Sequence, residues 1–169
     1  MLKALDVAKY FLAKDPGRNI FNLNLIERNG RFFYEGNAKI NKFLHLSQNV
    51  YIAKTGTTLF ADDLYAYDNG AVALNVVNDY AILQKKELSK PNFGDIINEF
   101  LDRMFYMLKS ADIDELIDLS HEDGEWIQKS RNYQKTDQKM DSMSRAAEYK
   151  DQYADTLMIM YRMDMNEND

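Results

Sequence analysis

The 169-residue sequence contains no cysteine and only two histidines, His45 and His121. Without cysteine the chain cannot form a disulfide or a thiolate zinc site, and a site with several histidine ligands would need both histidines to converge. No apolar run approaches the roughly 20 residues that a membrane-spanning helix needs. Residues 1–15 mix charged with apolar side chains, which is not the pattern of a secretory signal. We therefore expect a cytoplasmic protein that has no membrane partner.

The sequence also lacks the common motifs of catalysis and nucleotide binding. There is no GxxxxGK[ST], GxGxxG, HExxH or GxSxG, and there is no internal repeat or low-complexity tract. We expect no enzymatic activity, no catalytic residue, no cofactor and no bound metal. His45 lies between two leucines, and the simpler interpretation is a partly buried histidine with one hydrogen bond.

The densest group of polar residues is Ser120-His121-Glu122-Asp123, which is followed by Glu125 and Trp126. One interpretation makes His121 and the neighbouring carboxylates a metal or acid–base cluster. The interpretation that we favour is a helix start, in which Ser120 is the N-cap and the acidic residues lie near the positive end of the helix dipole. His121 would then bond to another helix, and Trp126 would fill the core.

The formal net charge of −6 argues against nucleic-acid binding as the main function, because phosphate contacts need lysine and arginine gathered on one face. A basic protein partner suits this charge better, since opposite potentials speed encounter. The simpler explanation is that the acidic surface keeps the protein soluble.

A hydrophobic content of 46% fits a globular protein, and the length fits one domain over residues 1–169. Apolar residues at three- and four-residue spacing predict a mainly α, compact multi-helix domain. Gly56 is expected to stop the second helix, and Asn92 is expected to cap the long helix that forms the core spine. Residues 85–91 are read as a charged connector and 130–141 as a surface loop, with fraying from 166 to 169. The expected helices are 2–13, 37–55, 62–69, 71–83, 92–108, 112–119, a short helix carrying Trp126, and 140–163.

Residues 20–35 change to the two-residue period of strands. Asn29-Gly30 between two strand-like runs predicts one small β-hairpin, because both central residues of a type I′ turn need positive φ. The second strand carries three consecutive aromatics, and a strand cannot point all three inward. We therefore expect an exposed partner surface there, made of Phe32, Phe33 and Tyr34.

Two groups of motifs lie in a fixed order along the chain. The first reads KINKFLH at 39–45, TGTTLF at 55–60, DDLYAY at 62–67 and GAV at 70–72, and it closes at Tyr80. The second reads LSHEDGEW at 119–126. Together they resemble the signatures of the Panacea domain, the SocA-like antitoxin or phage-associated protein family, most strongly over 37–127. Two departures are Tyr67, where the family usually has tryptophan, and Ala71, where it has proline.

This resemblance implies structural or partner-binding roles for the matching residues. They are Lys39, Lys42, Leu44, Gly56, Leu59, Phe60, Tyr67, Gly70, Val72, Tyr80, Ser120, His121 and Trp126.

The resemblance also implies a prokaryotic or prophage-borne antitoxin that neutralises a toxin, typically encoded next door, by direct protein–protein binding. One alternative is an adaptor that presents a partner to a protease, with a second surface within 130–169. Another is an enzyme centred on His121. A DNA-binding autoregulator is disfavoured by the lack of a basic face. The sequence leaves the toxin and the oligomeric state open.

Overall fold

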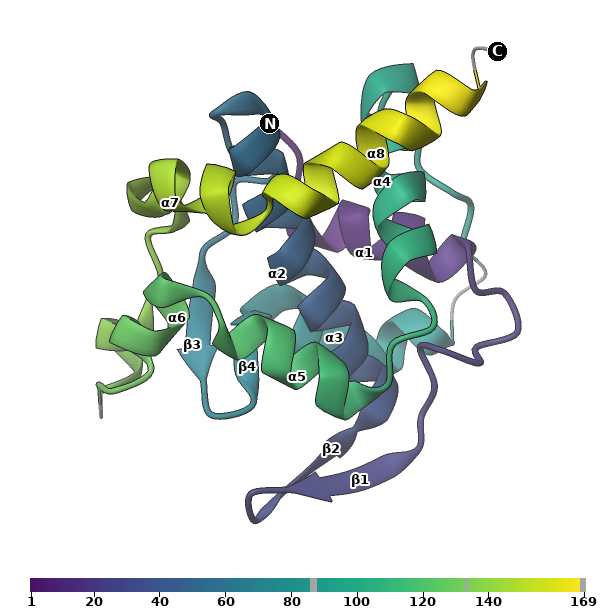
Figure 1. Cartoon of the computed structure of the whole chain (residues 1–169). Helices are drawn as coiled ribbons and strands as arrows, with labels where there is room; N and C mark the ends of the chain where they lie inside the picture. The colour runs from purple at the N-terminus through teal and green to yellow at the C-terminus, as the bar shows by residue number, and fades with distance from the viewer. Residues whose placement is uncertain (86–87, 133, 168–169) are drawn as a thin grey trace.

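A single long helix, α2 (Glu35–Thr55), runs through the middle of the molecule, and the other elements pack around it (Figure 1). The computed structural model describes residues 1–85, 88–132 and 134–167, leaving aside the side chains of residues 135, 136 and 167. The expected mainly helical fold is confirmed, although two β-hairpins accompany the helices where one was expected. The other helices are α1 (Ala4–Ala13), α3 (Leu74–Gln84), α4 (Asp95–Leu108), α5 (Ile113–His121), α6 (Gly124–Lys129), α7 (Ala146–Gln152) and α8 (Ala154–Glu167), with 3-10 turns η1 (Lys135–Gln138) and η2 (Ser142–Arg145).

α2 is buried on every side over its middle turns. It ends as expected at Gly56, whose φ of 77° is the left-handed conformation that glycine adopts without a Cβ clash. All residues from Asn41 to Val50 are buried, although six of the ten are polar or charged. The prediction that residues 92–108 form the core spine was therefore wrong. α2 holds that place because helices or strands cover each of its faces.

The apolar core gathers around Phe43 of α2. Its ring lies 5.5 Å from that of Phe11 on α1, 5.1 Å from that of Phe21, and 6.1 Å from that of Phe105 on α4. All three contacts have the tilted, edge-to-face geometry that aromatic rings prefer. This cluster ties the N-terminal segment to both long helices.

The predicted first hairpin is confirmed. Strands β1 (Leu25–Arg28) and β2 (Arg31–Tyr34) pair antiparallel, and Asn29 and Gly30 between them both have positive φ. Opposite residues share a face, so Leu25 and Tyr34 point the same way. The hairpin projects from the body of the molecule at the start of α2 (Figure 1).

The prediction of a helix over 62–69 is wrong, because this segment forms part of a second hairpin. Strand β3 (Leu64–Tyr67) pairs antiparallel with β4 (Gly70–Ala73), so Asp68-Asn69 is a tight turn and α3 begins later than expected, at Leu74. Side chains of β3 alternate between buried and half-buried, which is the pattern of a strand. Asp62 does lie near the start of a helix, but the helix is α1, where its carboxylate accepts from Ala4 N at 2.8 Å.

The ends of the C-terminal helices differ from those expected. Asn92 does not cap α4: the N-cap is Gly94, and Asn92 Oδ1 accepts from Gly94 N. Ile96, in the first turn of this helix, is 81% exposed. The helix expected over 140–163 is divided into η2, α7 and α8, with a break at the buried Tyr153.

Three segments named from the sequence contain residues that the structure does not describe. Positions 86–87 of the connector, 133 of the surface loop and 168–169 at the end lie outside the described residues, and α8 continues to Glu167. In the described part of the chain, no helix has both the length and the hydropathy that crossing a membrane requires.

Candidate functional site

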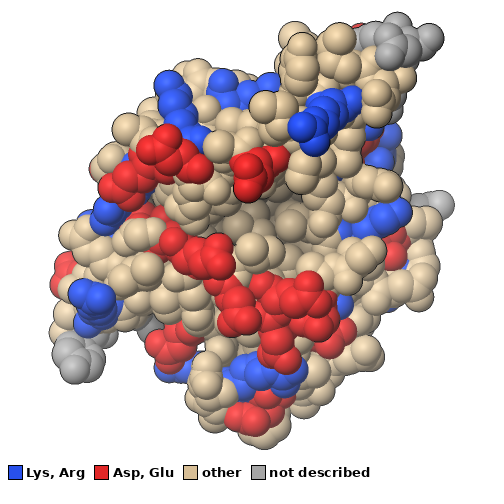
Figure 2. Space-filling model, viewed as in Figure 1, with Lys and Arg blue, Asp and Glu red and all other residues tan. Residues whose placement is uncertain are grey.

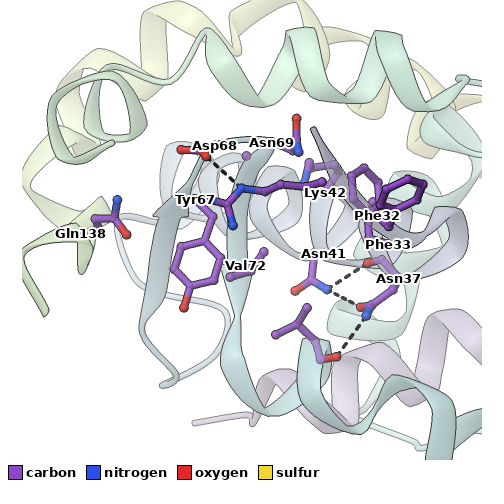
Figure 3. Close-up of a pocket in the computed structure, with 14 residues that line it drawn as sticks. Phe32, Phe33, Asn37, Asn41, Lys42, Tyr67, Asp68, Asn69, Val72 and Gln138 are labelled. Carbon is purple, nitrogen blue, oxygen red and sulfur yellow. Dashed lines mark hydrogen bonds and ion pairs between the residues drawn. The ribbon is translucent and has the colours of Figure 1, made fainter. Parts of the chain in front are cut away.

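A cavity of about 530 Å³ lies between the two hairpins and α2 (Figure 3). Its walls come from β2, the first two turns of α2, the β3–β4 hairpin and α3. Six residues singled out by the sequence line it. They are Phe32, Phe33, Lys42, Tyr67, Gly70 and Val72.

Lys42 is the unusual member of this lining. Its side chain is only 2% exposed, and burial lowers the pKa of its amine to about 7. A Cβ placed on Gly70 would lie 2.5 Å from Lys42 Cε and 2.8 Å from both Lys42 Nζ and Ser120 Oγ. Only glycine therefore lets β4 lie against this lysine.

The amides of the cavity are used within the fold. Asn41 donates to Asn37 O and Oδ1, while its own Oδ1 accepts from Ala73 N at 2.9 Å. Asn37 donates to Val77 O at 3.0 Å. At the rim, Arg31 Nε donates to Asp68 Oδ2 at 3.1 Å, which closes the gap between the two hairpins. The bonds of Asn41 and Asn37 hold α2 against β4 and α3.

Behind the cavity, His45 is fully buried and makes two short side-chain hydrogen bonds. Its Nδ1 lies 2.7 Å from Ser120 Oγ on α5, and its Nε2 lies 2.7 Å from Asp123 Oδ2. Because a carboxylate can only accept, Nε2 donates to Asp123. The expected partly buried histidine with one hydrogen bond is therefore corrected to a fully buried one with two.

The carboxylate of Asp123 collects four hydrogen bonds in the interior. Besides His45, the donors are the side chains of Asn49 and Tyr149 and the backbone N–H of Glu125. Burial raises the pKa of the Asp123 carboxyl, but the hydrogen bonds outweigh this effect and lower it to about 2. Burial and the neighbouring Asp123 charge raise the pKa of the Tyr149 hydroxyl.

The expected N-cap at Ser120 is wrong. Ser120 lies inside α5, and the cap of α6 is Asp123, whose Oδ1 accepts from Glu125 N. Ser120, His45 and Asp123 match the residue types of a nucleophilic relay, but all three are fully buried and none lines the cavity. Their hydrogen bonds join α2, α5 and α6.

His121 and its neighbouring carboxylates do not come together. The His121 ring stacks on Trp126 with centroids 3.8 Å apart, and Trp126 Nε1 donates to Tyr67 O at 2.8 Å. Burial and the charge of Lys42 lower the pKa of His121. Glu125 instead faces Arg145 and the backbone of Asp141. Over the described ranges, no three histidine or acidic side chains gather as a metal site would require.

The other motif residues hold the fold around α2. Leu59 and Phe60 are buried, and both of their backbone N–H groups donate to Gln48 Oε1. The Tyr80 hydroxyl donates to Asn22 O at 2.9 Å. Leu44 is buried in the core, and Lys39 forms an ion pair with Glu35 one turn earlier on α2.

The first hairpin presents an apolar outer face. Phe32 is 72% exposed, and Leu25 and Tyr34 on the same face are exposed as well, with Leu23 just before them. Phe33 points the other way, is half-buried and lines the cavity. We refer below to Leu23, Leu25, Phe32 and Tyr34 as the hairpin patch.

An acidic surface lies beside this hairpin. Acidic side chains gather over α5 in Figure 2, where five exposed residues carry them. Arg28 of β1 donates to Asp114 at 2.8 Å and so fixes the hairpin against α5. The five residues are Asp112, Asp114, Glu115, Asp118 and Glu122.

Several site residues could not be singled out from the sequence. Asn37, Asn41, Asn49 and Tyr149 have central roles in the polar contacts. For the three asparagines the available signal was the density of asparagine, lysine and histidine in the otherwise apolar run of residues 37–50, and nothing in the sequence marked Tyr149.

Residues 40–127, slightly more than half of the chain, match the family model described as antitoxin SocA-like, Panacea domain. No curated protein and no solved structure gives a match to the chain. The matched region contains the middle of α2, the β3–β4 hairpin, Ser120, Asp123 and Trp126, which build part of the cavity and most of the buried hydrogen-bond network. The chain therefore belongs to the antitoxin SocA-like, Panacea domain family.

Proposed function

We propose that this chain is the antitoxin of a toxin–antitoxin system and neutralises a cognate toxin by direct protein–protein binding, without a catalytic step of its own. The observation that carries this proposal is the family match over residues 40–127. We further propose that the toxin is encoded in the adjacent gene of a prokaryotic or prophage locus.

The surface that we assign to the toxin is the hairpin patch. Exposed aromatic side chains supply much of the contact energy in protein interfaces. Arg28 and Arg31 pair with Asp114 and Asp68 on the body of the molecule, so this apolar face is presented on a fixed support. The acidic side chains of α5 lie next to it, which suits a toxin whose contact surface is apolar and bordered by lysine or arginine.

The test is a pull-down with the adjacent gene product, scored beside growth rescue on co-expression. Phe32→Ala combined with Leu25→Ala should weaken binding by at least about tenfold and abolish rescue. Ile96→Ala is the matched control, because Ile96 is equally exposed and lies on α4. A harmless or unbound neighbour would contradict the antitoxin role, whereas full rescue by the double variant would contradict only the assigned surface.

A second candidate function is an adaptor that brings a partner to a protease. The supporting observation is a separate exposed apolar surface on α8, which crosses over α2 and α4 (Figure 1). A shorter half-life of the toxin when this chain is co-expressed would favour the adaptor. An unchanged toxin half-life would favour simple inhibition. The exposed residues are Met158, Ile159, Tyr161 and Met165.

A further inference from the structure

Lys42 lines the cavity between the hairpins, and among the described residues its amine has no counterion. Lys42 has no hydrogen bond and no ion pair with any described residue, and burial accounts for its lowered pKa. Its neighbour Lys39, one turn earlier on the same helix, is paired with Glu35. A buried cation without a partner is costly, so the fold leaves one strong donor unused at the back of the cavity.

The other polar groups of the cavity are already occupied. The amide groups of Asn37 and Asn41 bond to each other and to the backbone of α3 and β4. Asn69 accepts from Asn29 and donates to Arg28 O, and Arg31 is held by Asp68. Among the described lining residues, Lys42 is therefore the cation without an ion pair, since the charge of Arg31 is paired with Asp68.

The rest of the lining is largely apolar. Phe32 and Phe33 lie on one side of the cavity and Val72 lies on the other (Figure 3), and Ala38 and Val77 also line it. At about 530 Å³ the cavity is within the size range of small-molecule sites, which combine apolar walls with a few polar groups that fix orientation.

We propose that this cavity binds a carboxylate carried on an apolar body, with Lys42 Nζ as its counterion. A single buried amine matches the single charge of a carboxylate, whereas the second charge of a phosphate group would have no unpaired buried cation beside it. The carboxylate can belong to a free organic acid or to the C-terminus of a peptide with an apolar last residue. This site does not depend on the proposed toxin binding, because its occupancy is measured on the isolated chain.

The test compares an acid with its neutral amide. In calorimetric titrations of the full chain, octanoate should bind at least about tenfold more tightly than octanamide. A parallel arm compares acetyl-Gly-Gly-Leu with its C-terminal amide. Preference for octanoate alone identifies a free acid, and preference for the peptide acid identifies a C-terminus; either result supports the proposal.

Three variants locate the site. Lys42→Met should abolish the preference for the acid, while Lys39→Met should keep it. Ala38→Trp fills the cavity and should abolish binding of both compounds. Thermal melts check that each variant is folded, and the acid–amide comparison on the unchanged chain decides the question without any substitution.

Two results would overturn the proposal. One is that no acid binds better than its amide, which includes the case in which nothing binds. The other is that folded Lys42→Met keeps the full preference for the acid.

Discussion

The imidazole Nε2 of His45 on α2 lies 2.7 Å from Oδ2 of Asp123, the N-cap of α6, although the two residues are 78 positions apart in the chain. Both side chains are fully buried, and Asp123 also accepts from Tyr149 of α7. One carboxylate thus joins the central helix to two short C-terminal helices. Because those helices are too short to be stable alone, this contact should contribute strongly to their position.

We predict that Asp123→Ala lowers the free energy of unfolding by about 3–5 kcal/mol, because it leaves His45, Asn49 and Tyr149 without their common acceptor. Urea denaturation measures the change. Asp118→Ala, an exposed position on α5, should stay within about 0.5 kcal/mol of the unchanged chain. A loss below about 1 kcal/mol for Asp123→Ala would show that the network matters little for stability.

Asp123 should also make the protein sensitive to acid. Its pKa is about 2 in the folded protein, below the ordinary value of 3.8, so the unfolded chain binds more protons between these pH values. This contribution, about 2 kcal/mol, is complete above pH 4 and is lost as the pH falls toward 2. The pH dependence of unfolding in this range should be weaker in Asp123→Asn, and an unchanged profile would contradict the assignment.

Lys42 should make the free energy of unfolding depend on pH at neutral and alkaline pH. Its pKa falls from 10.5 to about 7 on folding, so the unfolded chain binds more protons between pH 7 and 10.5 and stability rises with pH there. Lys42→Met should remove this rise and stabilise the protein by a few kcal/mol at pH 6. Lys39→Met, which breaks an ion pair on the same helix, should not stabilise it. Unfolding experiments at pH 6, 8 and 10 measure both effects.

Gly70→Ala should cost at least about 2 kcal/mol, because φ is 118° and the new Cβ would overlap Lys42. Gly30→Ala provides the control: its φ is also positive, at 77°, but no atom lies within 4 Å of the added Cβ. Backbone strain alone should limit that loss to about 1 kcal/mol. Equal losses in the two variants would mean that the contact with Lys42 has no importance of its own.

The first hairpin could be predicted from its turn, because Asn29-Gly30 separates two alternating runs. The second hairpin also contains an Asn-Gly pair, but its turn is Asp68-Asn69 and Gly70 already belongs to β4, so this signal is shifted by one residue. The acidic pair Asp62-Asp63 favoured a helix start instead. Those acidic residues do interact with a helix N-terminus, but Asp62 binds that of α1, which is 58 residues away. Sequence spacing shows that a helix start is favoured nearby without showing which helix it belongs to.

The buried hydrogen-bond network was beyond prediction for a related reason. Asn37, Asn41, His45 and Asn49 look like the polar face of an amphipathic helix, and burial of that face depends on α5, α7 and β4 closing over it. The sequence did identify Lys42, Tyr67 and Gly70, which the cavity brings together from segments more than 20 residues apart. It could not reveal that Asp123 caps α6 in place of Ser120, which lies inside α5 and bonds to the distant His45.

The polar residues of α2 bond largely to main-chain atoms of the segments around them: Asn37 to Val77 O, Asn41 to Ala73 N, and Gln48 to the N–H groups of Leu59 and Phe60. Every residue type except proline offers the same main-chain groups. Outward-facing side chains of the surrounding segments can therefore be exchanged over evolutionary time without disturbing these bonds. The same internal scaffold could acquire a new binding specificity through changes confined to its outer surface.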